Sequence, residues 1–341
     1  MTNELAQSST EKNYDIKVRN PFVPIGPYRE RLPTPLSKLF PFLTEQERED
    51  LIYTKLMLEH ETCNQSSYVQ AACELTVCSW FAHVATSCGE RFEYEHMLAP
   101  PKDVDCAVWH QGTQFNIEVK CADYAKHQNI VAESDFIIHG LGRMDGYGDA
   151  VTQLQDLFGT SATPAILGAA HHMDCKLKDY LVSAQEKFGD DVHADSLNVL
   201  FVCVDDQMDM NKWIAYLNGP RGLFTKHSFE PQENYKNVDL VVFSNLYHRL
   251  ANLEQKDKIT AHWDLSQAFN FGVPNPQSTK VDDLYSLFAH LLPIENNEFF
   301  QFLEQLKMEE WLKSAIGLCH YVGDQIARGV HKFQGYPVDE V

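Results

Sequence analysis

The strongest constraint on the fold of this chain comes from residues 197–204, a strongly apolar run that includes Val199, Phe201 and Val202. A strand this apolar has to be buried on both faces, as happens in sheets that helices cover on both sides. We therefore expect an α/β fold in which a central mixed β-sheet is flanked by helices. No apolar run in the chain is long enough to span a bilayer, so the sequence predicts no membrane span.

Other segments have the patterns of strands and helices. Strands are predicted at 92–97, 104–109, 114–122, 212–217 and 238–243. Helices are predicted at 44–61, 67–86, 149–158 and 174–188, and again from residue 281 onward. Thr44 and Glu47 have the spacing of a capping box, and Gly112 is typical of a tight turn between two strands.

The chain divides into three predicted regions. Residues 1–43 are a proline-rich arm, 44–250 the core with its flanking helices, and 251–341 a helical C-terminal region. The six prolines from Pro21 to Pro41 cannot share a helix. The arm is more positively charged than the rest of the chain, so it either docks on a partner or a phosphate backbone, or lies as a strap across the protein's own surface. We favour the strap.

The composition narrows the functional classes. With 48 Asp and Glu residues against 28 Lys and Arg residues, the formal net charge is -20, which argues against a non-specific coat on nucleic acid. The first residues have neither the apolar core nor the cleavage signal of a secretion signal. Nine cysteines without a Cys-x-x-Cys pair are typical of reduced thiols, so we expect a cytoplasmic protein.

Residues that can carry chemistry are concentrated in the second and third predicted strands. The alternation in 115–121 is strict, so Glu118 and Lys120 share one face while apolar residues line the other. If these two strands pair through the turn at Gly112, Asp105 comes close to Glu118. A carboxylate pair with a neighbouring ammonium is then expected on one face of the sheet.

A further acid lies on the helix predicted at 67–86. This helix is apolar nearly all round and carries Glu74 as a lone carboxylate, which is costly unless it is paired or holds a cation. Glu74, Asp105 and Glu118 together would make an oxygen cage that suits Mg²⁺ or Mn²⁺, whose bound water attacks a phosphodiester. Lys120 would orient that water or offset charge that builds on the phosphorane.

This constellation resembles the PD-(D/E)xK nuclease superfamily, which has the restriction-endonuclease-like fold. The matching residues are Asp105, then Glu118-Val119-Lys120, with Glu74 on the preceding helix. The predicted order of helix, three strands, helix and strand is the αβββαβ order of the superfamily core. The resemblance implies that Asp105 and Glu118 bind the metal with the Val119 carbonyl as a further ligand, that Lys120 is the catalytic lysine, and that Glu74 is an auxiliary acid.

The motif departs from the family pattern at one position, because Val104 stands where the family has proline. Asp103 lies on the same face as Asp105, but we favour Asp105 because apolar Val104 and Cys106 place it inside the strand. The pattern of an acid, any residue and a lysine is weak evidence by itself. It also occurs as Asp15-Ile16-Lys17, Asp174-Cys175-Lys176 and Glu254-Gln255-Lys256.

Glu118 is selected because it lies in an apolar-flanked strand that follows a strand with an aspartate. The alternative is a surface Glu-Lys cluster that stabilises the sheet by under about 1 kcal/mol.

Three residues beyond the third strand are candidates for substrate binding. Lys126 and His127 follow the strand and could reach a phosphate, although they are also ordinary loop residues. Gln153 lies on a predicted helix at a place where several branches of the superfamily carry glutamine, and a solvated helix face explains it equally well.

From the resemblance we expect a Mg²⁺- or Mn²⁺-dependent endonuclease. We favour DNA over RNA as its substrate, although no residue pattern in the sequence separates the two. An association at the level of the fold suggests a prokaryotic restriction or anti-phage defence effector. The acidic charge suggests that a protein partner or a homo-oligomer supplies the positive surface that nucleic acid needs. The alternative is a catalytically inactive subunit that keeps the nuclease fold as an interaction platform.

Overall fold

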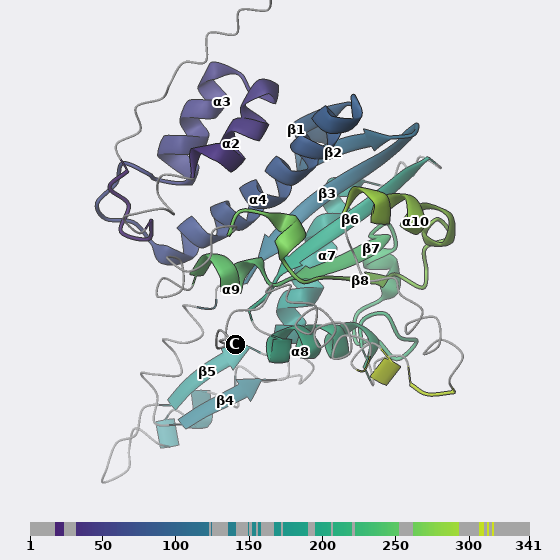
Figure 1. Ribbon diagram of the computed structural model, residues 1–341. Helices are drawn as coiled ribbons and strands as arrows, with labels where there is room; N and C mark the ends of the chain where they lie inside the picture. Colours follow the sequence, from purple (N-terminus) through teal and green to yellow (C-terminus); the bar gives the residue numbers. More distant parts are fainter. Residues whose placement is uncertain are drawn as a thin grey trace, which may run out of the picture.

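The centre of the molecule is a six-stranded mixed sheet with the strand order β1-β2-β3-β6-β7-β8 (Figure 1). In this computed structural model, these strands span Phe92–Ala99, Lys102–His110, Thr113–Cys121, Ser196–Cys203, Leu240–Ser244 and Asn270–Pro274. β1, β2 and β3 form an antiparallel meander, β3, β6 and β7 are parallel, and β8 is antiparallel to β7. The α/β fold with a central mixed sheet is thereby confirmed.

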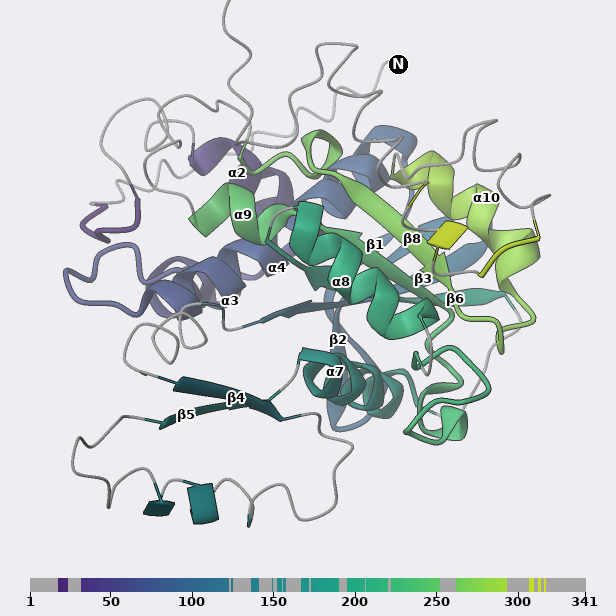
Figure 2. The same ribbon diagram turned by 90° about the horizontal axis from the view of Figure 1, so that it is seen from below.

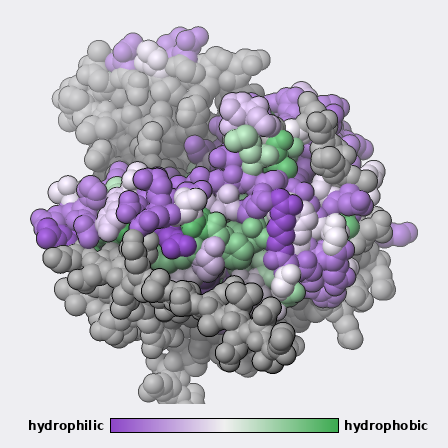
Figure 3. All heavy atoms as spheres, turned by 90° about the horizontal axis from the view of Figure 1, so that it is seen from above, coloured by the Kyte–Doolittle hydropathy of each residue, from purple (hydrophilic) through white to green (hydrophobic). Residues whose placement is uncertain are grey.

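The structure describes residues 18–23, 32–122, 124, 136–140, 149, 152–154, 156–157, 167–171, 173–189, 195–205, 207–219, 222–251, 262–292, 307–309, 312–313 and 316. Within them, β4 (Phe136–Gly140) and β5 (Leu167–His171) form a separate parallel pair, away from the main sheet (Figures 1 and 2). No helix in these ranges is long and apolar enough to cross a membrane. Polar residues cover most of the described surface in the view of Figure 3.

Helices cover both faces of the sheet (Figure 2). One face carries α4, α9 and α10, and the other carries α7 and α8. In chain order, α4, α7, α8, α9 and α10 span Gln65–Cys88, Met173–Phe188, Gln207–Asn218, Leu246–Ala251 and Val281–Leu291. Every residue of β6 is buried, as its apolar sequence predicts. The order α4, β1, β2, β3, α7, β6 is the expected helix, three strands, helix and strand, with β4 and β5 inserted before α7.

Aromatic side chains join the layers. On one face, the ring of Phe288 from α10 lies 5.9 Å from Phe81 of α4 and 5.5 Å from Phe115 of β3, between ring centroids. On the other face, Tyr180 of α7 stacks on Trp213 of α8 at 6.2 Å. Because α10 packs into the core and β8 is a strand of the main sheet, the predicted boundary at residue 250 falls inside one packed unit.

The prediction of a strand at 212–217 is wrong, because this segment belongs to α8. Its buried residues, Met210, Trp213, Ile214 and Leu217, recur every three or four positions, which is the period of a helix rather than of a strand. The strand at 238–243 and the helices at 67–86 and 174–188 are confirmed as β7, α4 and α7.

The helix predicted at 44–61 is shorter than expected. α3 (Glu45–Glu49) continues into a π-helical segment, η2 (Asp50–Lys55), and ends there. The capping box is confirmed, since the backbone N–H of Thr44 donates to Glu47 Oε2 at 2.6 Å and the N–H of Glu47 donates to Thr44 Oγ1. The segment thus ends at Lys55, a residue of the site described below.

The described part of the N-terminal arm lies on the protein itself, as the strap interpretation predicts. α2 (Pro33–Leu39) packs against α4, and its residues Leu36 and Leu39 are fully buried. Contrary to expectation, Pro33 and Pro35 share this helix. Both occupy its first turn, where the backbone N–H groups have no partner within the helix and a proline removes nothing.

The packing of α10 predicts that residues up to 292 unfold together with the sheet. We expect Phe288→Ala to lower the free energy of unfolding by about 3 kcal/mol, because it leaves a cavity between α4 and β3. Ser286→Ala on the exposed side of α10 is the control and should change stability by less than about 0.5 kcal/mol. Urea unfolding followed by tryptophan fluorescence measures both. An unchanged main transition in Phe288→Ala would mean that α10 is not part of the cooperative core.

Candidate active site

The hairpin between β2 and β3 sets the position of the two acids. Gln111 and Gly112 both have positive φ values, 52° and 85°, as a two-residue turn that matches strand twist requires. The ladder that starts there pairs Cys106 with Ile117. Continued by one residue, this register places Asp105 directly opposite Glu118, on the same face of the sheet. The charge of Glu118 contributes to the raised pKa of Asp105, which agrees with the expected approach of the two carboxylates.

Glu118 is fully buried on the face of the sheet that α7 covers. Its Oε1 atom lies 2.7 Å from Lys120 Nζ and 2.8 Å from Lys187 Nζ, and its Oε2 atom accepts a hydrogen bond from Lys187 at 2.9 Å. The contacts of Oε1 are ion pairs without a well-aligned hydrogen bond. Lys120 and Lys187 are each about one-fifth exposed, so the carboxylate is paired with two ammonium groups that still reach solvent.

Asp105 is held by the backbone of β3, because its Oδ2 atom accepts a hydrogen bond from the Val119 N–H at 2.6 Å. Burial raises the pKa of the Asp105 carboxyl well above its usual range, and the negative charges of Glu118 and Glu74 raise it further. The Lys187 charge and the Val119 N–H oppose this shift without cancelling it. Asp105 is therefore the member of the cluster whose negative charge is least compensated.

Glu74 lies on the opposite face of the sheet from Glu118 and has its own partner. Lys55 Nζ donates hydrogen bonds of 2.7 Å to Glu74 Oε1, to Glu95 Oε1 and to the Tyr94 hydroxyl oxygen. Burial alone would lower the pKa of Lys55, but the two carboxylates outweigh it and raise that pKa. Burial and the Glu74 charge likewise raise the pKa of Tyr94. Glu74 is thus paired with Lys55, whose charge it shares with Glu95.

A cavity of about 370 Å³ lies between α4 and the C-terminal end of β3. It is lined by Lys55, Ser67, Gln70, Ala71 and Glu74 on one side and by Val119, Lys120 and Cys121 on the other. Glu74 and the catalytic candidate Lys120 therefore open onto one space between α4 and β3. Asp105 and Glu118 are not among the residues that line it.

The remaining candidates from the sequence do not add to the charged cluster. Lys126 and His127 lie outside the described residues. Gln153 is exposed in a short helical stretch and does not line the cavity. Asp103, the alternative to Asp105, is partly exposed. Its negative charge raises the pKa of Lys187 less than that of Asp105 does. Asp105 remains the better choice because it is opposite Glu118.

Two of the three expected carboxylates are placed where they could bind a hard cation together. Among the described residues, no group of three or more His, Cys, Asp and Glu side chains is arranged to hold a metal ion. The three carboxylates are thus not brought into one cage, since Lys55 engages Glu74. Asp105 and Glu118 still offer the oxygen donors that Mg²⁺ and Mn²⁺ prefer. A cation between them would relieve the repulsion that raises the pKa of Asp105.

The sequence analysis missed Lys187 and Lys55. A signal for Lys187 was present in α7, where the buried positions Tyr180 and Ala184 lie seven and three residues before it. Such spacing places Lys187 on the side of the helix that faces the sheet. Lys55 is the last residue of the π-helical segment, so neither α-helical nor strand periodicity indicates where its side chain points.

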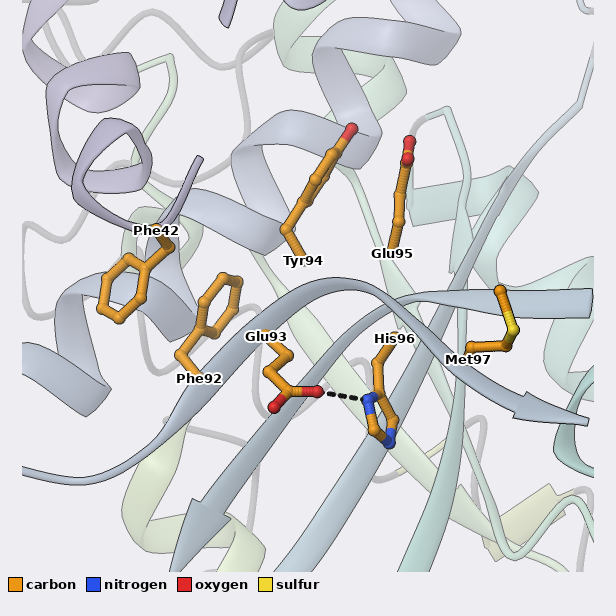
Figure 4. Close-up of a pocket in the computed structure, with 7 residues that line it drawn as sticks. All are labelled: Phe42, Phe92, Glu93, Tyr94, Glu95, His96 and Met97. Carbon is orange, nitrogen blue, oxygen red and sulfur yellow. Dashed lines mark hydrogen bonds and ion pairs between the residues drawn. The ribbon is translucent and has the colours of Figure 1, made fainter. Parts of the chain in front are cut away.

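A second cavity, of about 410 Å³, lies along the edge strand β1 and beside Phe42 (Figure 4). In this view Glu93 and His96 point toward each other, with Oε2 and Nδ1 2.5 Å apart, while Tyr94 and Glu95 point away from them. Arg91 also pairs with Glu93. Both acids that line this cavity are therefore in ion pairs, Glu93 with His96 and Arg91 and Glu95 with Lys55.

No family model, curated protein or solved structure matches this chain. The cluster of Asp105, Glu118, Lys120 and Lys187 is accordingly the feature from which a function has to be proposed.

Replacing each acid of the cluster by its amide should change the free energy of unfolding in opposite directions. Because the pKa of Asp105 is raised in the folded state, its ionisation costs stability as pH rises above the ordinary carboxyl value of about 4. Asp105→Asn keeps an acceptor for the Val119 N–H. It should raise the free energy of unfolding at pH 7 by about 1 kcal/mol or more, and the gain should vanish below about pH 4.

Glu118→Gln is the matched comparison. It leaves two partly buried ammonium groups without their counter-charge and should lower the free energy of unfolding by about 2 kcal/mol. Urea titrations of both variants between pH 4 and pH 8 measure the difference. If Asp105→Asn is destabilised across this whole range, the electrostatic description of the pair is wrong.

Proposed function

We propose that this protein is a metal-dependent nuclease that hydrolyses phosphodiester bonds, with DNA as its substrate. The observation that carries the proposal is the nearness of Asp105 and Glu118 on adjacent strands, where the charge of Glu118 acts on Asp105 and Lys120 contacts Glu118. Support also comes from the order of the core elements, which is the order that the PD-(D/E)xK resemblance implies.

In this proposal, Asp105 and Glu118 hold a Mg²⁺ or Mn²⁺ ion, with the Val119 carbonyl as a further ligand. Such an ion supplies Lewis acidity and lowers the pKa of a bound water at neutral pH. Lys120 donates to a non-bridging phosphate oxygen and offsets the charge that develops there. Glu74, which lines the cavity beside Lys120, is the auxiliary acid.

The setting of the activity is also part of the proposal. We place the enzyme in the cytoplasm, where its free cysteines stay reduced. A restriction or anti-phage defence role rests on fold-level association. The net charge of -20 favours a protein partner or a homo-oligomer that supplies positive surface for nucleic acid.

A second candidate is a nuclease-fold subunit that acts only as an interaction platform. The observation in its favour is that two lysines already neutralise Glu118, so the cluster is electrostatically satisfied without an ion. Cleavage assays separate the two candidates.

The experiment compares cleavage of supercoiled plasmid, linear duplex and RNA by the full-length protein with Mg²⁺, Mn²⁺ or EDTA. We expect metal-dependent cutting of DNA that falls at least about 100-fold in Asp105→Asn and in Lys120→Met. Asp105→Asn is the informative acid variant, because it is expected to fold stably. Asp103→Asn is the control, since it removes a carboxylate from the same strand, and it should keep most of the activity.

Cleavage that survives both Asp105→Asn and Lys120→Met would place the active site elsewhere. If stably folded wild-type protein cuts no substrate with either metal, the platform becomes the better account.

A further inference from the structure

Lys187 contacts both oxygens of the central carboxylate, Glu118. Its Nζ atom lies 2.8 Å from Oε1 and 2.9 Å from Oε2, and Lys120 Nζ lies 2.7 Å from Oε1. Glu118 is fully buried, so its two oxygens have few other approaches. Lys187 therefore covers the carboxylate from the side of α7 and touches both atoms that could bind an ion.

The formal charges of the four cluster residues add up to zero without a metal, although Asp105 is less well compensated than Glu118. Asp105 and Glu118 contribute two negative charges, and Lys120 and Lys187 contribute two positive charges. Only one of these lysines belongs to the strand motif, and the second comes from a helix 69 residues further along the chain. A divalent cation that binds Glu118 has to take an oxygen that Lys187 now contacts, and it adds positive charge next to that ammonium.

We infer that Lys187 is an internal counter-ion that occupies Glu118 in the absence of metal and competes with the divalent cation for it. Lys187 thereby sets the cation concentration at which the site fills. This inference rests on the proposed function, because it concerns the same metal site. It assigns Lys187 a positioning role, since the residue acts through Glu118 rather than on the substrate.

A purely structural ion pair has different consequences. If Lys187 only stabilised the fold, its replacement would lower the free energy of unfolding and leave the affinity for a metal ion unchanged. If Lys187 competes with the metal ion for Glu118, its replacement raises the affinity for that ion, because the carboxylate becomes more available. The dissociation constant for the ion separates the two roles.

The test is a calorimetric titration of Mn²⁺ into full-length wild-type protein and into Lys187→Met. We expect Lys187→Met to bind Mn²⁺ at least about tenfold more tightly, because a competing charge in contact with Glu118 is gone. Lys187→Arg keeps the charge and should bind like wild type. Lys178→Met is the control on the same helix, where the ammonium pairs with exposed Asp179 at 2.8 Å, and it should also bind like wild type.

Lys187→Gln, which keeps a polar side chain, replaces Lys187→Met if the latter does not fold. Equal affinity of wild type and both neutral variants would overturn the inference and leave the proposed metal site intact. Failure of wild type and all variants to bind Mn²⁺ would overturn both. Tighter binding that disappears when Glu118→Gln is added to Lys187→Met would assign the competition to this carboxylate.

Discussion

A carboxylate buried within a β-sheet is the constraint on which the rest of this structure depends. Glu118 has no exposed surface, and an isolated buried charge would cost far more than one domain can tolerate. The structure meets this cost with two ammonium groups, one from the same strand and one from α7. The position of α7 against the sheet is therefore tied to the charge of Glu118, so local chemistry and tertiary packing are coupled at this point.

The charge of the second acid, Asp105, is compensated less completely. Asp105 receives a backbone hydrogen bond, yet burial and two nearby carboxylates raise its pKa. Glu74, on the other side of the sheet, pairs with Lys55 and shares that ammonium group with Glu95. Repulsion between carboxylates that a fold could easily avoid is typical of sites that bind cations or protons, where stability is exchanged for function. This uneven compensation, rather than the motif alone, supports the nuclease proposal.

The sequence predicted those parts of the fold that depend on local periodicity. Strict alternation in 115–121 and the turn at Gly112 were sufficient to predict the β2–β3 hairpin and the facing acids. The segment 212–217 was misread because its apolar residues fit both periods over so short a window, and only burial at three- and four-residue spacing identifies a helix. Pro33 and Pro35 were misjudged because the first turn of a helix tolerates proline.

The rest of the site could not be predicted because it depends on contacts between distant segments. Lys187 meets Glu118 across 69 residues, and Lys55 meets Glu74 from an irregular π-helical segment. Helical periodicity places Lys187 on the side of α7 that faces the sheet, but it does not indicate which strand residue Lys187 meets. The sequence also gave no sign that Glu74 lies on the opposite face from Glu118, because pairing of α4 with one face of the sheet is decided by packing of the whole core.

The most direct test of the central claim is anomalous diffraction from crystals of the protein soaked in Mn²⁺. The proposal predicts a single strong peak between the carboxylates of Asp105 and Glu118, accompanied by loss of the contact between Lys187 and Glu118. A well-ordered Asp105–Glu118 pair without a peak, or a peak confined to surface carboxylates elsewhere, would contradict the assignment of this cluster as a metal-dependent active site.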